Sequence, residues 1–188
     1  LQAVRKLCDD ENLVLIFDEV QCGMGRSGKF FAYQHYNLKP DVVCMAKGIA
    51  GGFPMGGIIA CDKVAQVFTP GTHASTFGGN PLASAASRYV LSVITGDGFL
   101  DEVAEKGNYL TEKLRVLKEE HKCITDVRGM GLMIGVAVSV PTGEIINKAM
   151  EKGLLLVGAG SDAIRFVPPL TINKEEIDRA VEIFGECL

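Results

Sequence analysis

A single lysine, Lys47, stands between an apolar run and a glycine-rich loop. Residues 42–46 have the length and composition of a buried strand, and Gly48, Gly51 and Gly52 follow the lysine. A buried lysine is costly unless its ammonium is paired or used in chemistry, and glycines let the backbone approach a bound molecule closely. This pattern suggests a lysine that forms a Schiff base with pyridoxal phosphate. The alternative is an exposed lysine at a strand end, the commoner environment for this residue.

Two further charged residues occupy positions suited to chemistry. Asp18 follows the apolar run 13–17, which is predicted to be a strand buried on both faces, and α/β sheets bind ligands at the carboxyl ends of such strands. An ordinary polar strand exit explains Asp18 equally well. Arg165 lies in the alternating strand 164–167, just before two prolines. Its planar guanidinium suits a substrate carboxylate, and a surface charge is the alternative.

Two glycine-rich stretches are candidate phosphate-binding sites. Residues 69–81 combine hydroxyls, glycines and an asparagine ahead of Pro81, which can begin a helix. Such a cluster suits a phosphate, and a plain loop with a helix cap is the alternative. Residues 23–28 match G-x-G-x-x-G, but residues 18–22 separate them from the preceding strand and no acidic residue ends a second strand at the required distance. They favour a nicotinamide-dependent oxidoreductase only weakly.

The remaining patterns predict an α/β fold in two parts. Residues 1–96 contain a helix tail, strands 13–17, 42–46 and 58–61, a short helix capped by Asp62 and a helix over 82–95. A break at residues 96–98 predicts a domain boundary. Residues 97–188 contain helices over 99–121, 141–152 and 174–187, the last capped by Asn173, and strands 132–138, 154–157 and 164–167. The second part therefore reads as a small α+β domain.

Composition narrows the function classes. The 188 residues carry 19 Lys and Arg against 23 Asp and Glu, a net charge of −4, so no basic surface for nucleic acid or a membrane is expected. Six cysteines lack C-x-x-C spacing, which indicates reduced thiols rather than a disulfide framework or a metal site. No run is long enough to span a bilayer and no signal peptide is present, so a cytoplasmic protein is expected. The opening resembles a helix without its N-cap, which suggests the C-terminal part of a longer protein.

Taken together, several stretches resemble the class III aminotransferases, pyridoxal phosphate enzymes of fold type I. The matching stretches are residues 15–21 with 25–28, 40–43 with 46–48, 71–81, 127–133 and 164–170. Their order and spacing cover the whole chain, which is more specific than any one stretch. The resemblance implies that residues 1–96 are the C-terminal portion of the pyridoxal phosphate-binding large domain, with a mostly parallel sheet and flanking helices, and that 97–188 are the small C-terminal domain.

The resemblance also implies roles at the cofactor ring. Lys47 is expected to hold the cofactor covalently and to carry the proton between substrate and cofactor. Asp18 is expected to pair with the pyridine nitrogen and keep it protonated, which makes the ring an electron sink. Val20 is expected to pack on one face of the ring, and Gln21 to form a hydrogen bond near its 3-hydroxyl.

Further implied roles concern the phosphate, the substrate and the partners. Ser75 and Thr76 are expected to bind the phosphate, with the threonine reaching the neighbouring subunit's cofactor, so a homodimer would share its active sites. Arg165 is expected to bind a carboxylate of 2-oxoglutarate or of the amino donor. Within the family the stretches most resemble enzymes that use N2-acetylornithine, in arginine biosynthesis. Ornithine, succinylornithine or 4-aminobutyrate are alternative donors, and an inactive fragment or assembly half is an alternative of a different class. The N-terminal half of the same enzyme is an expected partner.

Overall fold

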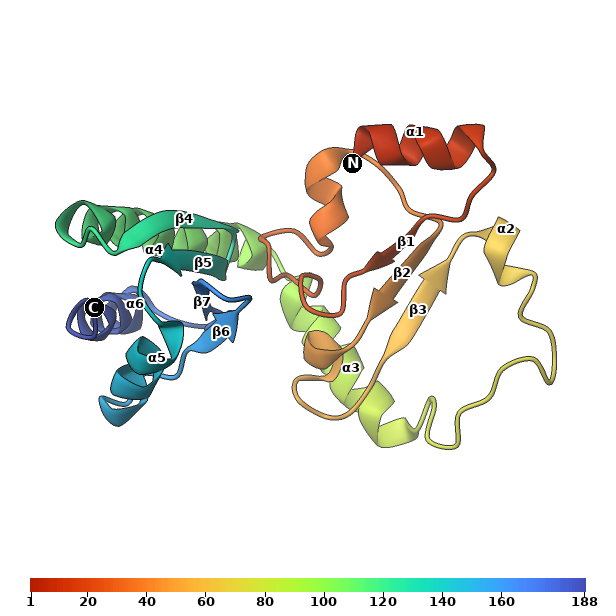
Figure 1. The fold of residues 1–188 in the computed structure, drawn as a ribbon. Helices are drawn as coiled ribbons and strands as arrows, with labels where there is room; N and C mark the ends of the chain where they lie inside the picture. The colour runs from red at the N-terminus through yellow and green to blue at the C-terminus, as the bar shows by residue number, and fades with distance from the viewer. The chain divides into compact units, whose positions relative to one another are not determined.

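The computed structural model describes residues 1–188, which divide into two compact units. The first comprises Leu1–Gly25 and Lys29–Leu100, and the second comprises Arg26–Gly28 and Asp101–Leu188 (Figure 1). The division lies close to the break read from residues 96–98. No local pattern predicted that a tripeptide from the first part of the chain belongs to the second unit.

The first unit is built on a three-stranded sheet in the order β1-β2-β3. The elements are α1 (Gln2–Asp10), β1 (Ile16–Asp18), η1 (Ala32–Tyr36), β2 (Val42–Met45), η2 (Lys47–Ala50), β3 (Gly57–Ala60), α2 (Asp62–Ala65) and α3 (Pro81–Ile94). β1 pairs with β2 in parallel and β3 pairs with β2 in antiparallel orientation. The buried side chains of this unit are Met24, Phe31, Val43, Met45, Ile49, Ala50 and Ile94.

The first strand differs from its prediction. The expected strand over 13–17 is reduced to Ile16–Asp18, and the prediction that it is buried on both faces is wrong. Ile16 in β1 is 56% exposed and Ile59 in β3 is 54% exposed, whereas Leu15, just before β1, is buried. The reason is that β1 and β3 are the two edge strands of this sheet and only the central β2 is buried along its length.

Helix α3 begins as its sequence predicts. Asn80 is its N-cap and accepts a hydrogen bond from the backbone N–H of Ala83 at 2.9 Å, while Pro81 occupies the first turn. The helix packs against η2, so closely that a Cβ on Gly51 would lie 3.1 Å from Val90 Cγ2. The cap of α2 is different from the prediction, because Cys61 rather than Asp62 holds that position.

Asp41 ties α1 to the start of the sheet and makes the first unit sensitive to acid. Its carboxylate accepts hydrogen bonds from Leu15 N–H at 2.8 Å and from Arg5 at 3.0 Å, and these bonds lower its pKa. Because the folded pKa lies below the unfolded one, the stabilisation is complete above the ordinary pKa of about 4 and is lost as pH falls through the folded value. Asp41→Asn should flatten the acid side of a urea-midpoint curve measured between about pH 2 and 6. An unchanged acid limb would contradict this role.

The second unit is a four-stranded antiparallel sheet in the order β4-β5-β7-β6 with three helices. Its elements are α4 (Phe99–Glu120), β4 (Ile124–Met130), β5 (Met133–Val138), α5 (Thr142–Glu151), β6 (Val157–Ala159), β7 (Ala163–Phe166) and α6 (Lys174–Gly185). Two features differ from the prediction. The strand β4, which forms a hairpin with β5, was not predicted, and β6 begins at Val157 instead of residue 154. Asn173 caps α6 as predicted, in a capping box with Glu176.

An arginine anchors the tripeptide Arg26–Gly28 in the second unit. Arg26 donates to the backbone oxygens of Leu132 and Pro168, and its own backbone oxygen accepts from Leu132 N–H at 3.0 Å. The backbones at Gly131 and Ser27 pack closely, since a Cβ on Gly131 would lie 2.5 Å from the carbonyl carbon of Ser27. The tripeptide is therefore a packed part of this unit.

Arg26→Met is expected to destabilise the second unit markedly. The substitution keeps much of the side-chain volume but leaves two part-buried carbonyl oxygens without their donor, at roughly 1–3 kcal/mol each. Urea denaturation of the purified protein measures the loss. Arg128→Met is the matched control, because Arg128 is exposed and pairs only with the exposed Asp126, so a change within about 0.5 kcal/mol is expected. Equal effects of the two substitutions would rule out the anchoring role.

Candidate functional site

Lys47 and Asp18 lie at the same edge of the first sheet. Asp18 ends β1 and is in register with Cys44 of β2, and the next residue, Glu19, donates its N–H to Cys44 O at 2.9 Å. Lys47 follows two residues after the end of β2. Because β1 and β2 are parallel, their carboxyl ends meet at one edge, which is where open α/β sheets bind ligands.

The backbone at Lys47 is strained. Its φ is +47°, in the left-handed region that residues with a Cβ rarely enter, and such strain costs of order 1–3 kcal/mol. Gly51 and Gly52 also have positive φ, at +61° and +103°. The lysine side chain is exposed within this chain and lines a cavity of about 420 Å³ with Gly48 and residues 51–55. Strain held at an accessible lysine beside an open cavity distinguishes it from an ordinary strand-end lysine.

A second cavity adjoins the first and contains one of the predicted phosphate ligands. It has a volume of about 290 Å³ and is lined by Ser75, residues 77–80, Ala83 and residues 54–56. Pro54 and Met55 line both cavities, so Ser75 and Lys47 lie in neighbouring hollows. Thr76 is exposed and is not among the lining residues.

The turn after β1 carries the remaining predicted ring contacts. Asp18 is exposed, and its Oδ1 accepts a hydrogen bond from Val20 N–H at 2.9 Å. Val20 is half-buried and Gln21 is exposed. Three side chains with different chemistry therefore lie at the end of β1 and in the turn that follows it.

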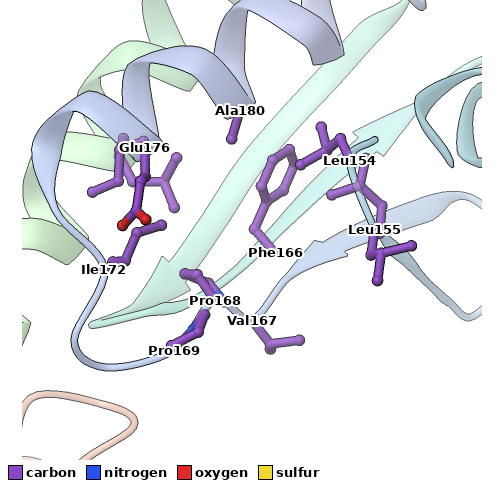
Figure 2. Close-up of a pocket in the computed structure, with 12 residues that line it drawn as sticks. Leu154, Leu155, Phe166, Val167, Pro168, Pro169, Ile172, Glu176 and Ala180 are labelled. Atoms are coloured by element: carbon purple, nitrogen blue, oxygen red, sulfur yellow. The ribbon is translucent and has the colours of Figure 1, made fainter. Parts of the chain in front are cut away.

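Arg165 belongs to the second unit. It lies in the middle of β7, where it is paired with Gly135 of β5 and Val157 of β6, and it is half-buried. The same unit has a pocket of about 400 Å³ beside β7 (Figure 2). Leucines, prolines and Phe166 line it, and the carboxylate of Glu176 is its one charged group. None of the predicted site residues line that pocket, so Figure 2 shows a feature separate from the predicted site.

The residues of the first unit fit pyridoxal phosphate by their chemistry. Lys47 supplies an amine, Asp18 a carboxylate and Ser75 a hydroxyl close to the start of α3. A Cβ built on Gly52 or Gly79 meets no atom within 4 Å, so both glycines face open space. An amine, a carboxylate and a hydroxyl are suited in turn to an aldehyde, a protonated ring nitrogen and a phosphate.

The alternative of a dinucleotide site lacks its structural context. Residues 23–28 form consecutive turns, with positive φ at Met24, Gly25 and Gly28, and no helix begins at these glycines. A dinucleotide fingerprint requires a helix N-terminus there to hold the pyrophosphate.

No helix in the structure is long and apolar enough to cross a membrane.

The sequence analysis did not identify two residues that the structure brings out. In the first unit, Glu19 is buried although it follows the exposed Asp18 directly, and in the second unit Arg26 anchors the tripeptide described above. The alternation of side chains along a strand was the available signal for Glu19, because it places neighbours on opposite faces. Nothing local in the sequence marked Arg26, whose partners lie more than a hundred residues away.

The chain resembles known proteins over its entire length. The family profile "Aminotransferase class-III" matches residues 1–188. The acetylornithine aminotransferase of Caldanaerobacter subterraneus subsp. tengcongensis is 51% identical over 189 residues, which cover 100% of this chain and 48% of that protein. The enzyme of the same name from Bacillus subtilis is 43% identical over 100% of this chain and 49% of its own length. The chain thus spans about half the length of the curated relatives it matches.

Solved aminotransferase structures are also similar to this chain. The ornithine aminotransferase of Plasmodium yoelii has a TM-score of 0.92 at 35% identity, covering 99% of this chain and 50% of that one. N-acetylornithine aminotransferase from Stenotrophomonas maltophilia has a TM-score of 0.90 at 36% identity, with 99% and 50% coverage. The predicted α/β architecture of fold type I is confirmed. The chain belongs to the class-III aminotransferase family.

Proposed function

We propose that this chain forms part of a pyridoxal phosphate-dependent enzyme that transfers the amino group of N2-acetylornithine to 2-oxoglutarate. The products are N-acetylglutamate semialdehyde and glutamate. The observation that carries the proposal is the strained, accessible Lys47 at the sheet edge that also bears Asp18. The 51% identity to a protein named acetylornithine aminotransferase supports the choice of donor over ornithine.

The chain's residues have separable tasks in this reaction. When bound, pyridoxal phosphate supplies an aldehyde that accepts the amino group and a ring that stores the electron pair left by the departing proton. Lys47 would hold the cofactor through its amine, and the same amine would carry a proton to and from the substrate carbon. Asp18 would pair with the ring nitrogen through a charge-assisted hydrogen bond. Val20 would pack on one face of the ring, and Gln21 would form a hydrogen bond near its 3-hydroxyl.

Further proposed roles concern the phosphate, the substrate and the partners. Ser75 binds the cofactor phosphate beside the start of α3, and Arg165 binds a substrate carboxylate through its bidentate guanidinium. The exposure of Thr76 supports its reaching the cofactor of a second subunit, so the active enzyme is a homodimer with shared sites. The exposed apolar edge strands β1 and β3 support a further partner, the other half of the same enzyme.

Donor choice is tested with the complete enzyme and a panel of amines. N2-acetylornithine, ornithine, succinylornithine and 4-aminobutyrate are each assayed with 2-oxoglutarate by the formation of glutamate. The proposal expects the highest kcat/KM for N2-acetylornithine. A preference of tenfold or more for another donor would replace the named substrate while keeping the reaction, and no glutamate from any donor would refute the transaminase.

The 188-residue chain alone is expected to bind pyridoxal phosphate poorly and to turn over little. It spans about half of its relatives' length, and its sheet has two exposed edges. Absorbance titration of the isolated chain with pyridoxal phosphate measures the affinity, with the complete enzyme as the reference. Full transaminase turnover by the isolated chain would contradict the proposed need for the other half.

A further inference from the structure

Glu19 is a buried carboxylate that the proposed reaction does not use. Only 3% of the residue is exposed. Its Oε2 accepts hydrogen bonds from Ala32 N–H at 2.9 Å and from the Cys22 thiol at 3.1 Å, and its Oε1 accepts from Tyr33 N–H at 2.9 Å. Burying a carboxylate is expensive, and such a group persists where fixed donors satisfy it. Here the donors come from two segments, the turn after β1 and the start of η1.

The Cys22 thiol can donate its hydrogen bond to Glu19 because it stays protonated. Burial raises the pKa of Cys22 to about 12, and the hydrogen bond to Glu19 acts in the same direction. The thiol is therefore protonated at neutral pH, and it donates to the carboxylate. Cys22 is thus a positioned donor and not a reactive thiolate.

The main chain of Glu19 is fixed as firmly as its side chain. Its N–H donates to Cys44 O at the end of β2, and its carbonyl accepts from Gly23 N–H, both at 2.9 Å. The packing admits no extra atom, because a Cβ on Gly23 would lie 2.7 Å from Glu19 O and 3.3 Å from Phe31. One residue therefore joins β2, the turn and η1.

We propose that Glu19 is the positioning residue for Asp18. Successive side chains of an extended strand point to opposite faces. Glu19, locked inward by three donors, therefore turns Asp18 outward at the edge shared with Lys47 and fixes the turn through Val20. This inference rests on the proposed function, in which Asp18 pairs with the cofactor ring. If Glu19 merely stabilises the fold, its loss would lower the melting temperature without altering the behaviour of Asp18.

The test is a double-mutant cycle in the complete enzyme. Glu19→Gln keeps the shape but brings an NH2 group against one of the backbone N–H donors, so the turn must shift. A misplacement near 1 Å costs on the order of 10²-fold in turnover. Glu19→Gln should lower kcat by about that factor and change the cofactor's absorbance in the same direction as Asp18→Asn. The double variant should lose little more than Asp18→Asn alone, because both act through one contact.

A second readout requires no cofactor. Hydrogen exchange of the unloaded enzyme should quicken in residues 18–23 of Glu19→Gln and stay unchanged in β2. Glu176→Gln is the matched control, since Glu176 also accepts a backbone N–H, from Asn173 at 2.9 Å, but lies in the second unit. It should leave the cofactor spectrum unchanged.

The outcomes separate this inference from the proposed function. If Asp18→Asn changes neither spectrum nor turnover, the role of Asp18 itself fails. If Asp18→Asn acts but the effects of Glu19→Gln add to it fully, Glu19 does not work through Asp18 and the inference is overturned. If Glu19→Gln does not fold, Cys22→Ala is used instead, because it removes one of the three donors to Glu19. It is expected to shift the cofactor spectrum in the same direction as Asp18→Asn, but by a smaller amount. Cys22→Ser keeps a donor and should resemble the wild type. A wild-type spectrum for Cys22→Ala together with intact folding would also overturn it.

Discussion

Replacing Lys47 with alanine is expected to lower kcat by at least about 10³-fold, through loss of both the covalent anchor and the proton carrier, since a positioned acid–base group alone contributes roughly 10²–10⁴-fold. The structure singles out this lysine by its left-handed backbone and its cavity. The half-reaction with N2-acetylornithine is measured in single turnover through the cofactor's absorbance. Added methylamine should restore part of the rate, because a free amine can replace the proton carrier but not the anchor.

Lys39→Ala is the control for Lys47→Ala. Lys39 is also exposed and precedes the same strand, yet it lines neither cavity of the site. Its turnover should equal that of the wild type. Wild-type turnover in Lys47→Ala, or an equal loss in Lys39→Ala, would remove Lys47 from the mechanism.

The second large effect is expected from Asp18→Asn, which should lower kcat by about 10²–10³-fold. Asparagine preserves the size of the side chain but removes the negative charge that we propose keeps the ring nitrogen protonated, and loss of one preorganised electrostatic contact typically costs this much. Asp18 is available for such a contact because it lies exposed at the end of β1. Steady-state kinetics with saturating cofactor measure the change.

Asp97→Asn supplies the matched control, since Asp97 is an exposed aspartate in the break after α3. It should leave kcat unchanged. An analogue of pyridoxal phosphate methylated at the ring nitrogen carries a fixed positive charge, so it should rescue much of the turnover of Asp18→Asn. A loss confined to KM, with kcat intact, would show that Asp18 does not act on the ring.

Local sequence rules predicted the two asparagine caps, although Cys61 rather than Asp62 caps α2. Asn80 with Pro81 and Asn173 with Glu176 satisfy helix N–H groups within a few residues, so the signal and the structure involve the same short segment. The spacing of apolar residues in α4 predicts one buried face, and Val103, Leu110, Leu114 and Leu117 are buried there, whereas Phe99 and Leu100, which share the pattern, are half-buried.

The features that local patterns did not predict depend on contacts between residues that are distant along the chain. Residues 13–17 have the composition of a buried strand, but burial depends on neighbouring strands, and β1 is an edge within these 188 residues. Arg26 meets carbonyls 106 and 142 residues away. Asp18 and Lys47 come to one edge through the parallel pairing of β1 and β2, which the sequence predicted. That Arg165 and Thr76 join them stays a prediction.

The central claim is that Lys47 is the covalent anchor, and borohydride reduction of the enzyme loaded with pyridoxal phosphate tests it most directly. Reduction converts the link between lysine and cofactor into a stable secondary amine, which peptide mass spectrometry locates. The phosphopyridoxyl mass is expected on the peptide that contains Lys47 and on no other lysine in stoichiometric amount. Stoichiometric labelling of a different lysine, or of none, would contradict it.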